Sequence, residues 1–243
     1  METIRELAKF NHIKYYDKPH KYYIDGEEMI SATTFIGKFK EKFEEDYWSK
    51  RKAKERGITQ KEILAEWKHK ALTSTEKGTA FHEYAENYLT NRIFPYPEKR
   101  INSVLGEGND VKERFDKLVK LFDKFYEDSY GKLIPIRAEL VVGDKELGIC
   151  GMVDQLFFNE KSNKLEIWDW KTNKKIDKSN RWQNFKEPVS HLDVCELNTY
   201  SLQLSLYKYI IGRNTNIELG DCYIVWFNEK NDKYFPIKCH DYT

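Results

Sequence analysis

The segment 151–171, GMVDQLFFNEKSNKLEIWDWK, constrains the fold of this 243-residue chain more than any other part of it. Two runs rich in apolar and aromatic residues, 147–158 and 164–171, flank a polar break near 159–164. Such runs around a polar turn predict two paired β-strands. The hairpin would bring Asp154 of the first strand close to Asp169 and Lys171 at the end of the second.

These three residues together predict a metal-dependent hydrolytic site. A carboxylate inside an apolar strand is costly unless a cation compensates its charge, and Lys171 shares a strand face with Asp169. Taken alone, Asp154 or Asp169 could cap a strand end or pair with a surface lysine, and Lys171 could be solvated. Two acids and a lysine favour Mg²⁺ or Mn²⁺ and phosphodiester hydrolysis, in which Lys171 polarises the attacking water or stabilises charge at phosphorus.

Two further residues could join this site. His82 lies early in a predicted helix, where an isolated histidine is more often structural, and its HExxE context lacks the second histidine of a zinc protease. With an acidic site nearby, His82 could add a ligand or orient a phosphate. Glu139 lies in an alternating strand before the Asp154 strand. It reaches the same site if the two strands pair, and is otherwise an exposed strand residue.

Gln203 and Tyr207 lie four residues apart on one face of a predicted helix. They could contact a phosphate or position the lysine, or they could belong to a partly buried amphipathic helix.

The predicted loop 172–194 interleaves cations with aromatic side chains, a pattern that suits single-stranded nucleic acid. The alternative is a solvated charged face. The formal net charge of the chain is +1, so a partner protein could be needed for affinity. The candidate nucleic-acid-binding residues are Lys174, Lys175, Lys178, Arg181 and Trp182.

The remaining patterns predict a mixed sheet flanked by helices, of class α/β (α+β), and not a doubly wound nucleotide fold. A hairpin at 20–36 turns at Asp25-Gly26, and two charged helices within 37–72 break near Gly57, with Thr59 and Glu62 as a capping box. We expect residues 1–75 to form an N-terminal hairpin and helical lobe, and 76–243 the core. The other expected elements are helices over 74–90, 110–130 and 195–212 and strands over 134–143, 220–228 and 233–239.

The four cysteines are widely spaced, so they predict buried, reduced thiols and neither a zinc site nor an iron–sulfur cluster. The chain has no signal-peptide pattern at its start and no apolar run near the ~20 residues of a membrane span. These patterns predict a soluble cytoplasmic protein without a membrane partner.

The order of the motifs resembles the PD-(D/E)XK nuclease superfamily. Within it, the chain is most similar to the RecB-type exonuclease branch, which includes phage exonucleases and the mitochondrial genome maintenance exonuclease. The resemblance spans about 76–210, and the N-terminal segment around 20–34 also looks like that of phage members. The motifs are Gly78-Thr-Ala-Phe-His82, Glu139, Gly151-Met-Val-Asp154, Asp169-Trp-Lys171 and Gln203-Leu-Ser-Leu-Tyr207.

The resemblance implies a restriction-endonuclease-like core and assigns roles to these residues. Asp154, Asp169 and the backbone carbonyl of Trp170 would hold the metal, with His82 and Glu139 as additional ligands. Lys171 would be the catalytic lysine, with Gln203 and Tyr207 as the trailing helical motif. Some relatives carry a four-cysteine iron–sulfur cluster, but the cysteine spacing here does not fit one.

The expected function is a Mg²⁺- or Mn²⁺-dependent deoxyribonuclease. We expect an exonuclease that prefers single strands or free ends, acting in DNA replication, recombination or repair in a bacterial or phage-infected cell. Two alternatives stay open. One is a structure- or sequence-specific endonuclease on the same core, and the other is a non-catalytic nucleic-acid-binding protein.

Overall fold

The computed structural model describes residues 2–90 and 109–243. Its centre is a mixed sheet in the order β1-β2-β3-β5-β6-β7-β8, with β4 paired to β5 off this path. The β3–β5 and β6–β7 pairs are parallel and the other pairs are antiparallel. The predicted mixed sheet is therefore confirmed. The strands are β1 (Lys14–Tyr16), β2 (Lys21–Ile24), β3 (Glu27–Ser31), β4 (Leu133–Asp144), β5 (Ile149–Asn159), β6 (Lys164–Lys171), β7 (Leu219–Trp226) and β8 (Phe235–Lys238).

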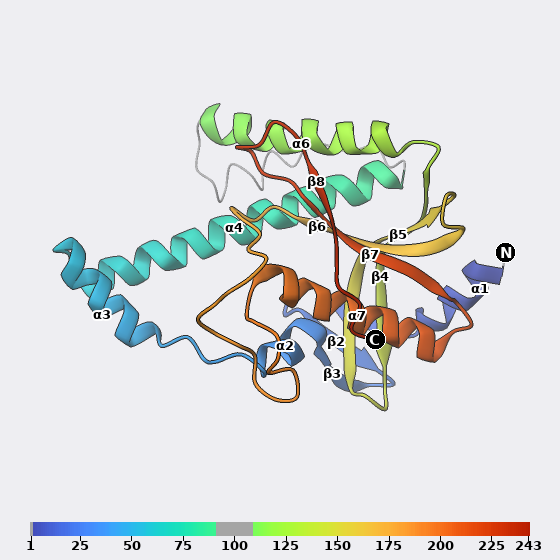
Figure 1. Ribbon diagram of the computed structural model, residues 1–243, viewed down its shortest axis with the longest axis horizontal. Helices are drawn as coiled ribbons and strands as arrows, with labels where there is room; N and C mark the ends of the chain where they lie inside the picture. Colours follow the sequence, from blue (N-terminus) through green and yellow to red (C-terminus); the bar gives the residue numbers. More distant parts are fainter. Residues whose placement is uncertain (1, 91–108) are drawn as a thin grey trace.

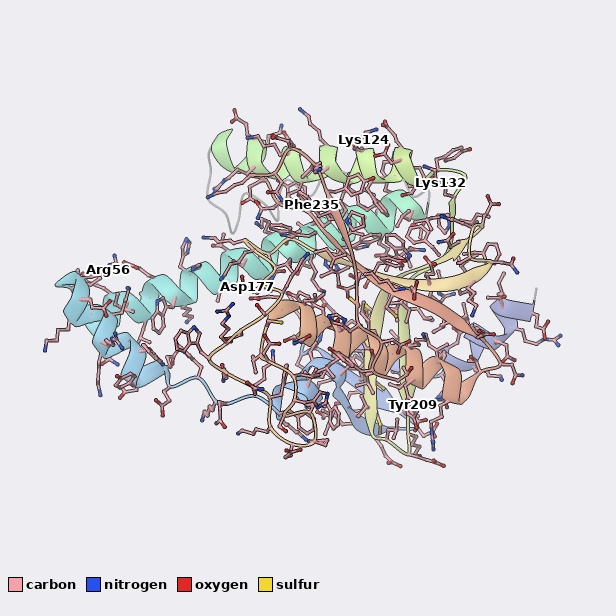
Figure 2. The ribbon with its side chains drawn as sticks, viewed as in Figure 1. Arg56, Lys124, Lys132, Asp177, Tyr209 and Phe235 are labelled. Atoms are coloured by element: carbon pink, nitrogen blue, oxygen red, sulfur yellow. The ribbon has the colours of Figure 1, made fainter. Side chains whose placement is uncertain are left out.

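Helices cover both faces of the sheet. Figure 1 shows α4 and α6 on one face and α7 on the other, while α3 and the first half of α4 project beyond the sheet as a helical arm. Arg56, at the far end of this arm in Figure 2, pairs with Glu66 of α4. No described helix is long and apolar enough to cross a membrane. The helices are α1 (Glu2–Leu7), a short 3-10 turn (Ala8–Phe10), α2 (Ala32–Gly37), α3 (Glu45–Arg56), α4 (Gln60–Leu89), α6 (Asn109–Ser129) and α7 (Glu196–Asn214).

The two faces of the sheet bury separate hydrophobic clusters. Alternation along β6 sends Ile167 toward the α7 side and Trp168 and Trp170 toward α4 and α6. Trp170 is 1% exposed and contacts the rings of Phe122 and Phe125, among others. Burial of these rings on one face holds the neighbouring polar residues of β6 on the opposite face.

The β5–β6 hairpin predicted from the sequence is confirmed, and it opens at one end. Its ladder runs from Asn159↔Lys164 to Gln155↔Trp168. Beyond that pair, β6 continues alongside β7 as far as Lys171↔Trp226. The start of β5 pairs instead with β3, through Ile30↔Ile149. Asp154 and the last residues of β6 therefore lie where the paired part of the hairpin ends.

Local signals in the N-terminal part are confirmed. Asp25 and Gly26 have φ values of 51° and 84°, as a type I′ turn requires. Gly57 ends α3 in the left-handed conformation, and Thr59 and Glu62 form both bonds of the capping box.

Two predicted helix boundaries are wrong. The sequence predicts a separate helix over 74–90, but α4 is continuous from Gln60 to Leu89. The hydroxyls of Thr73 and Thr79 donate to backbone carbonyls one turn earlier, so these polar residues do not interrupt the helix. The helix α7 also continues past Gly212 to Asn214.

The predicted boundary between 1–75 and 76–243 stays a prediction. The helix α4 passes through residue 75 without a break, and β3 joins the same sheet as β5.

Candidate active site

Asp154, His82 and the backbone of Trp170 form a connected polar cluster at the open end of the hairpin. The Trp170 N–H donates to Asp154 Oδ2 at 2.7 Å. That oxygen lies 3.4 Å from His82 Nδ1, and His82 Nε2 lies 3.0 Å from the Trp170 carbonyl oxygen. The side chain of Trp170 is buried in the core, so its backbone is held rigidly between Asp154 and His82.

Asp169 and Lys171 form a buried ion pair beside this cluster. The Lys171 ammonium also lies 4.7 Å from the ring centroid of Tyr200, a cation–π contact. Asp169 is 2% exposed, and its Oδ2 contacts the Lys171 ammonium. A carboxylate has more acceptor sites than one ammonium contact uses, so Asp169 can also offer an oxygen ligand to a divalent cation.

Glu139 of β4 lies opposite Asp154, between the pairs Ala138↔Gln155 and Leu140↔Val153. Its φ of 45° is uncommon for a residue with a side chain and stores backbone strain. One ligand atom from each of His82, Glu139 and Asp154 lies within 4.8 Å of the others. The pairing of β4 with β5, which the sequence left open, thus brings Glu139 to the site.

Gln203 and Tyr207 extend from α7 into the same space. Gln203 Nε2 donates to the Tyr207 hydroxyl at 3.0 Å, and both side chains are buried. The Tyr207 ring lies directly over Gly151, where a Cβ atom would approach Tyr207 Cε1 to 2.2 Å. The absence of a side chain at residue 151 is what allows α7 to bring this tyrosine against β5.

One cavity of about 380 Å³ joins these residues, and we call it the catalytic cavity. It contains the side chains predicted from the sequence as catalytic or metal-binding, whereas Trp170 is not part of its lining and its backbone bonds to Asp154 and His82 beside it. The predicted side chains that line it are His82, Glu139, Asp154, Asp169, Lys171, Gln203 and Tyr207.

The catalytic cavity also contains residues that the sequence did not single out. Tyr15, His20 and Tyr22, from the hairpin of β1 and β2, form part of its wall. The Tyr15 hydroxyl lies 2.7 Å from His20 Nδ1, and the rings of Tyr15 and Tyr22 are stacked. The resemblance to phage nucleases predicted for segment 20–34 could have drawn attention to His20 and Tyr22 but not to Tyr15, and nothing local in the sequence connects these residues to β5.

The predicted nucleic-acid-binding residues are not gathered in one place. All of them lie in the irregular segment after β6 and are exposed. Lys174 borders a cavity between α4 and α6. Lys178 lies outside both that cavity and the catalytic cavity. Lys175, Arg181 and Trp182 line a further cavity beside the N-terminus of α7.

A family model described as the PD-(D/E)XK nuclease superfamily matches residues 50–234, which is most of the chain. The chain belongs to the PD-(D/E)XK nuclease superfamily. The mixed sheet with helices on both faces is accordingly a restriction-endonuclease-like core. Membership implies a metal-dependent nuclease with DNA as its substrate. No curated protein matches the chain.

In this PD-(D/E)XK nuclease, the acidic groups of the catalytic cavity repel one another. Burial and the charge of Asp154 raise the pKa of Glu139 to about 8. Burial and Asp154 likewise raise the pKa of Asp169 to about 6, against the opposing effect of Lys171. Burial disfavours the charged imidazole of His82, but Asp154 outweighs it and raises the pKa of His82 to about 9. The metal-free cavity therefore holds protons at neutral pH that a bound cation would displace.

We expect the affinity of the nuclease for Mn²⁺ or Mg²⁺ to rise by about tenfold or more between pH 6 and pH 9. The pKa values of Glu139 and His82 are raised, so both groups are protonated at low pH and lose their protons across this range. Isothermal titration calorimetry in buffers of different ionisation enthalpy would measure the affinity and the protons released. Equal affinity at both pH values, without proton release, would contradict this expectation.

Proposed function

We propose that this nuclease is an exodeoxyribonuclease that hydrolyses phosphodiester bonds from free ends and prefers single-stranded DNA. The observation that carries the hydrolytic part is the convergence of Asp154, Asp169 and Glu139 with Lys171 in one cavity. The likeness of the motif order to RecB-type nucleases supports the exonuclease activity. An exposed Trp182 in a cation-rich loop supports the preference for single strands. Such an enzyme would act in DNA replication, recombination or repair.

The donors of the cavity fit a hard divalent cation, Mg²⁺ or Mn²⁺. We propose that Asp154, Glu139 and His82 hold it, with Asp169 and the Trp170 carbonyl as further ligands. A bound cation would supply positive charge that stabilises the charge developing at phosphorus and on the leaving 3′ oxygen. Three carboxylates fit such a cation, since a bound positive charge would relieve the repulsion that raises the pKa values of Glu139 and Asp169.

We propose that Lys171 acts directly on the reacting atoms. Asp169 and the ring of Tyr200 hold its ammonium at the catalytic cavity, where burial favours electrostatic stabilisation. The pKa of Lys171 is raised, because the attraction of Asp169 and Asp154 outweighs the cost of burial, so the side chain stays protonated. It can therefore orient the attacking water and stabilise negative charge at phosphorus, but it cannot act as the base.

Gln203 and Tyr207 have a positioning role in this proposal. Their mutual hydrogen bond fixes both side chains against β5, where they can contact the bound phosphate. The loop cations Lys174 and Lys178 would follow the DNA backbone outside the cavity by charge attraction.

The test is digestion of end-labelled linear single-stranded, linear duplex and circular single-stranded DNA with Mg²⁺, Mn²⁺ or EDTA. We expect metal-dependent loss of the linear single strand, slower loss of the duplex and no cutting of the circle. The position of the label gives the polarity. Cutting of the circle would establish an endonuclease, and DNA binding without cleavage would favour a non-catalytic role or a missing partner protein.

An Asp169→Ala, Lys171→Ala double variant of the same preparation is the control for contaminating nuclease. We expect this variant to lose cleavage on every substrate. Full activity in the double variant would contradict the assignment of the catalytic cavity.

A further inference from the structure

A second cavity of about 680 Å³ lies between the loop after β6, the N-terminus of α7 and the segment that leaves α2. We call it the flanking cavity. Tyr200 and Asn173 belong to its wall. Since the Tyr200 ring also contacts the Lys171 ammonium, the flanking cavity adjoins the catalytic cavity. Its remaining charged and aromatic lining comes from Lys40, Lys175, Asp177, Arg181, Trp182 and Glu196.

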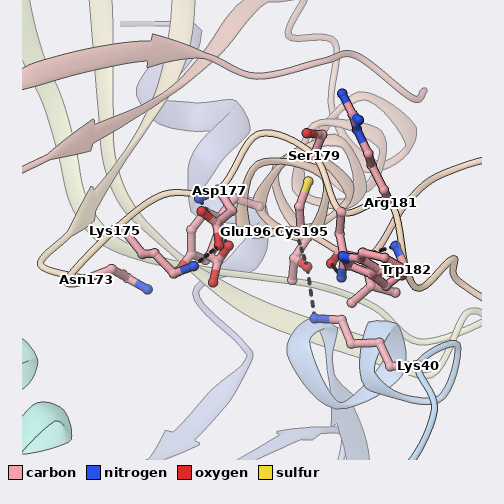
Figure 3. Close-up of a pocket in the computed structure, with 13 residues that line it drawn as sticks. Lys40, Asn173, Lys175, Asp177, Ser179, Arg181, Trp182, Cys195 and Glu196 are labelled. Carbon is pink, nitrogen blue, oxygen red and sulfur yellow. Dashed lines mark hydrogen bonds and ion pairs between the residues drawn. The ribbon is translucent and has the colours of Figure 1, made fainter.

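The charges of the flanking cavity are separated. Figure 3 shows Lys175, Asp177 and Glu196 on one side and Lys40 and Trp182 on the other. Both carboxylates on the acidic side already have partners, because Lys175 pairs with Asp177 and Glu196 accepts a hydrogen bond from the backbone N–H of Asp177 at 3.1 Å. The other side presents Lys40, Arg181 and the Trp182 ring.

Lys40 is half-buried, and no carboxylate pairs with it in the described part of the chain. Its ammonium donates to Thr199 Oγ1 at 2.9 Å and lies 5.5 Å from the ring centroid of Phe185. An ammonium has three donor hydrogens, so its hydrogen bond to Thr199 leaves capacity for an anion. Burial lowers the pKa of Lys40, against the smaller opposing attraction of the Glu196 carboxylate.

Trp182 is 96% exposed, which is unusual for the largest apolar side chain. Its backbone N–H donates to the Asn180 side chain at 3.1 Å. The backbone N–H of Asn180 in turn donates to the Asp193 carboxylate, and its side chain donates to the Val194 carbonyl at 2.8 Å. These hydrogen bonds fix the loop backbone at Trp182, so the exposed indole extends from an ordered segment.

We propose that the flanking cavity binds one unpaired nucleotide of the DNA strand that enters the catalytic cavity, with its base stacked on Trp182 and its phosphate bound by Lys40. This inference rests on the proposed function and identifies where the nuclease distinguishes a single strand from a duplex. A base within a duplex is covered by its neighbours and its partner, so its face is not available to the indole. Stacking on an aromatic side chain accepts every base, which suits an enzyme without sequence preference.

The test is binding of a fluorescein-labelled single-stranded oligonucleotide and of its blunt duplex, both in EDTA so that no cleavage occurs. We expect Trp182→Ala to raise the Kd for the single strand by about 10-fold and that for the duplex by less than about 2-fold. Trp182→Phe retains a ring and should stay within about 3-fold of the unaltered protein. Binding should quench tryptophan emission, and Trp182→Phe should remove that quenching.

The phosphate contact is tested in the same assay. Lys40→Met should weaken single-strand binding by about 10-fold and reduce the slope of affinity against salt by about one. Lys38→Met is the matched control, because it removes the same charge two residues away, outside the flanking cavity. The Kd of the Lys38→Met variant for the single strand should change by less than about 2-fold at physiological salt.

Because Trp182 is exposed, equal melting temperatures of Trp182→Ala and the unaltered protein would confirm that removing the indole leaves the fold intact.

Failure of the inference and failure of the proposed function give different results. If the unaltered protein digests linear DNA while Trp182→Ala and Lys40→Met bind the single strand normally, the assignment of the flanking cavity is overturned. If both variants lose single-strand binding but the unaltered protein cleaves no DNA, the cavity assignment stands and the nuclease function is wrong.

Discussion

Replacing Lys171 with methionine is expected to lower kcat for DNA cleavage by about 10²–10³-fold, the usual effect of removing one group that stabilises the transition state. The KM for DNA should change little, since the ammonium contacts Asp169 and Tyr200 within the catalytic cavity and is not one of the loop cations proposed to follow the DNA backbone. Single-turnover cleavage of an end-labelled strand with Mg²⁺ would measure the change.

The same substitution is also expected to lower the stability of the protein, and bound metal should reverse part of this effect. Without Lys171, the buried Asp169 carboxylate lacks its neutralising partner, so the melting temperature in EDTA should fall. Saturating Mn²⁺ should restore much of that loss by binding to the same carboxylates. Lys161→Met, in the exposed turn at the closed end of the β5–β6 hairpin, is the control and should alter neither kcat nor stability appreciably. Unchanged kcat in Lys171→Met would remove this lysine from the mechanism.

Substituting alanine for Gly151 is expected to destabilise the protein by about 3 kcal/mol, at the upper end for overpacking of a buried site. The new Cβ would lie 2.2 Å from Tyr207 Cε1 and 2.7 Å from Cζ, and the ring is packed between β5 and α7. For a protein of this size the melting temperature should fall by about 6–12 °C. Displacement of Tyr207 would also break its bond from Gln203 and lower activity.

Two variants control this prediction. Gly212→Ala lies on α7, where a Cβ meets no atom within 4 Å, so helix propensity should raise stability by up to about 1 kcal/mol. Adding Tyr207→Leu to Gly151→Ala should recover part of the lost stability, because the clashing ring is removed, yet it should not recover activity. If the melting temperature of Gly151→Ala equals that of the unaltered protein, the close approach of Tyr207 is not a constraint on the fold.

The hairpin that carries Asp154, Asp169 and Lys171 could be predicted because it is local. Apolar alternation, a polar turn and the two-residue spacing of Asp169 and Lys171 all lie within one segment. The capping box at Thr59 and the type I′ turn at Asp25 were predictable for the same reason, since each depends on a few adjacent residues. The break expected near residue 73 was wrong because polar side chains can bond within a helix as well as end one.

His82 and Glu139 show the limit of what local sequence patterns can predict. Each had an ordinary structural interpretation, and each joins the site only because its element packs against β5. The contribution of Tyr15 and His20 could not be predicted locally, because it depends on the pairing of Ile30 with Ile149. The distribution of the loop cations over separate cavities likewise depends on how that loop folds around α7.

The sequence by itself determined the hairpin, the alternation of its strands and the acids and lysine at its open end, because turns and strand faces depend on neighbouring residues. The tertiary structure decided which distant residues complete the catalytic cavity: His82 from α4, Glu139 from β4, Tyr207 from α7 and Tyr15 from the N-terminal hairpin. Those contacts follow from the packing of all the helices and strands on one sheet, and burial of large rings such as Trp170 determines that packing.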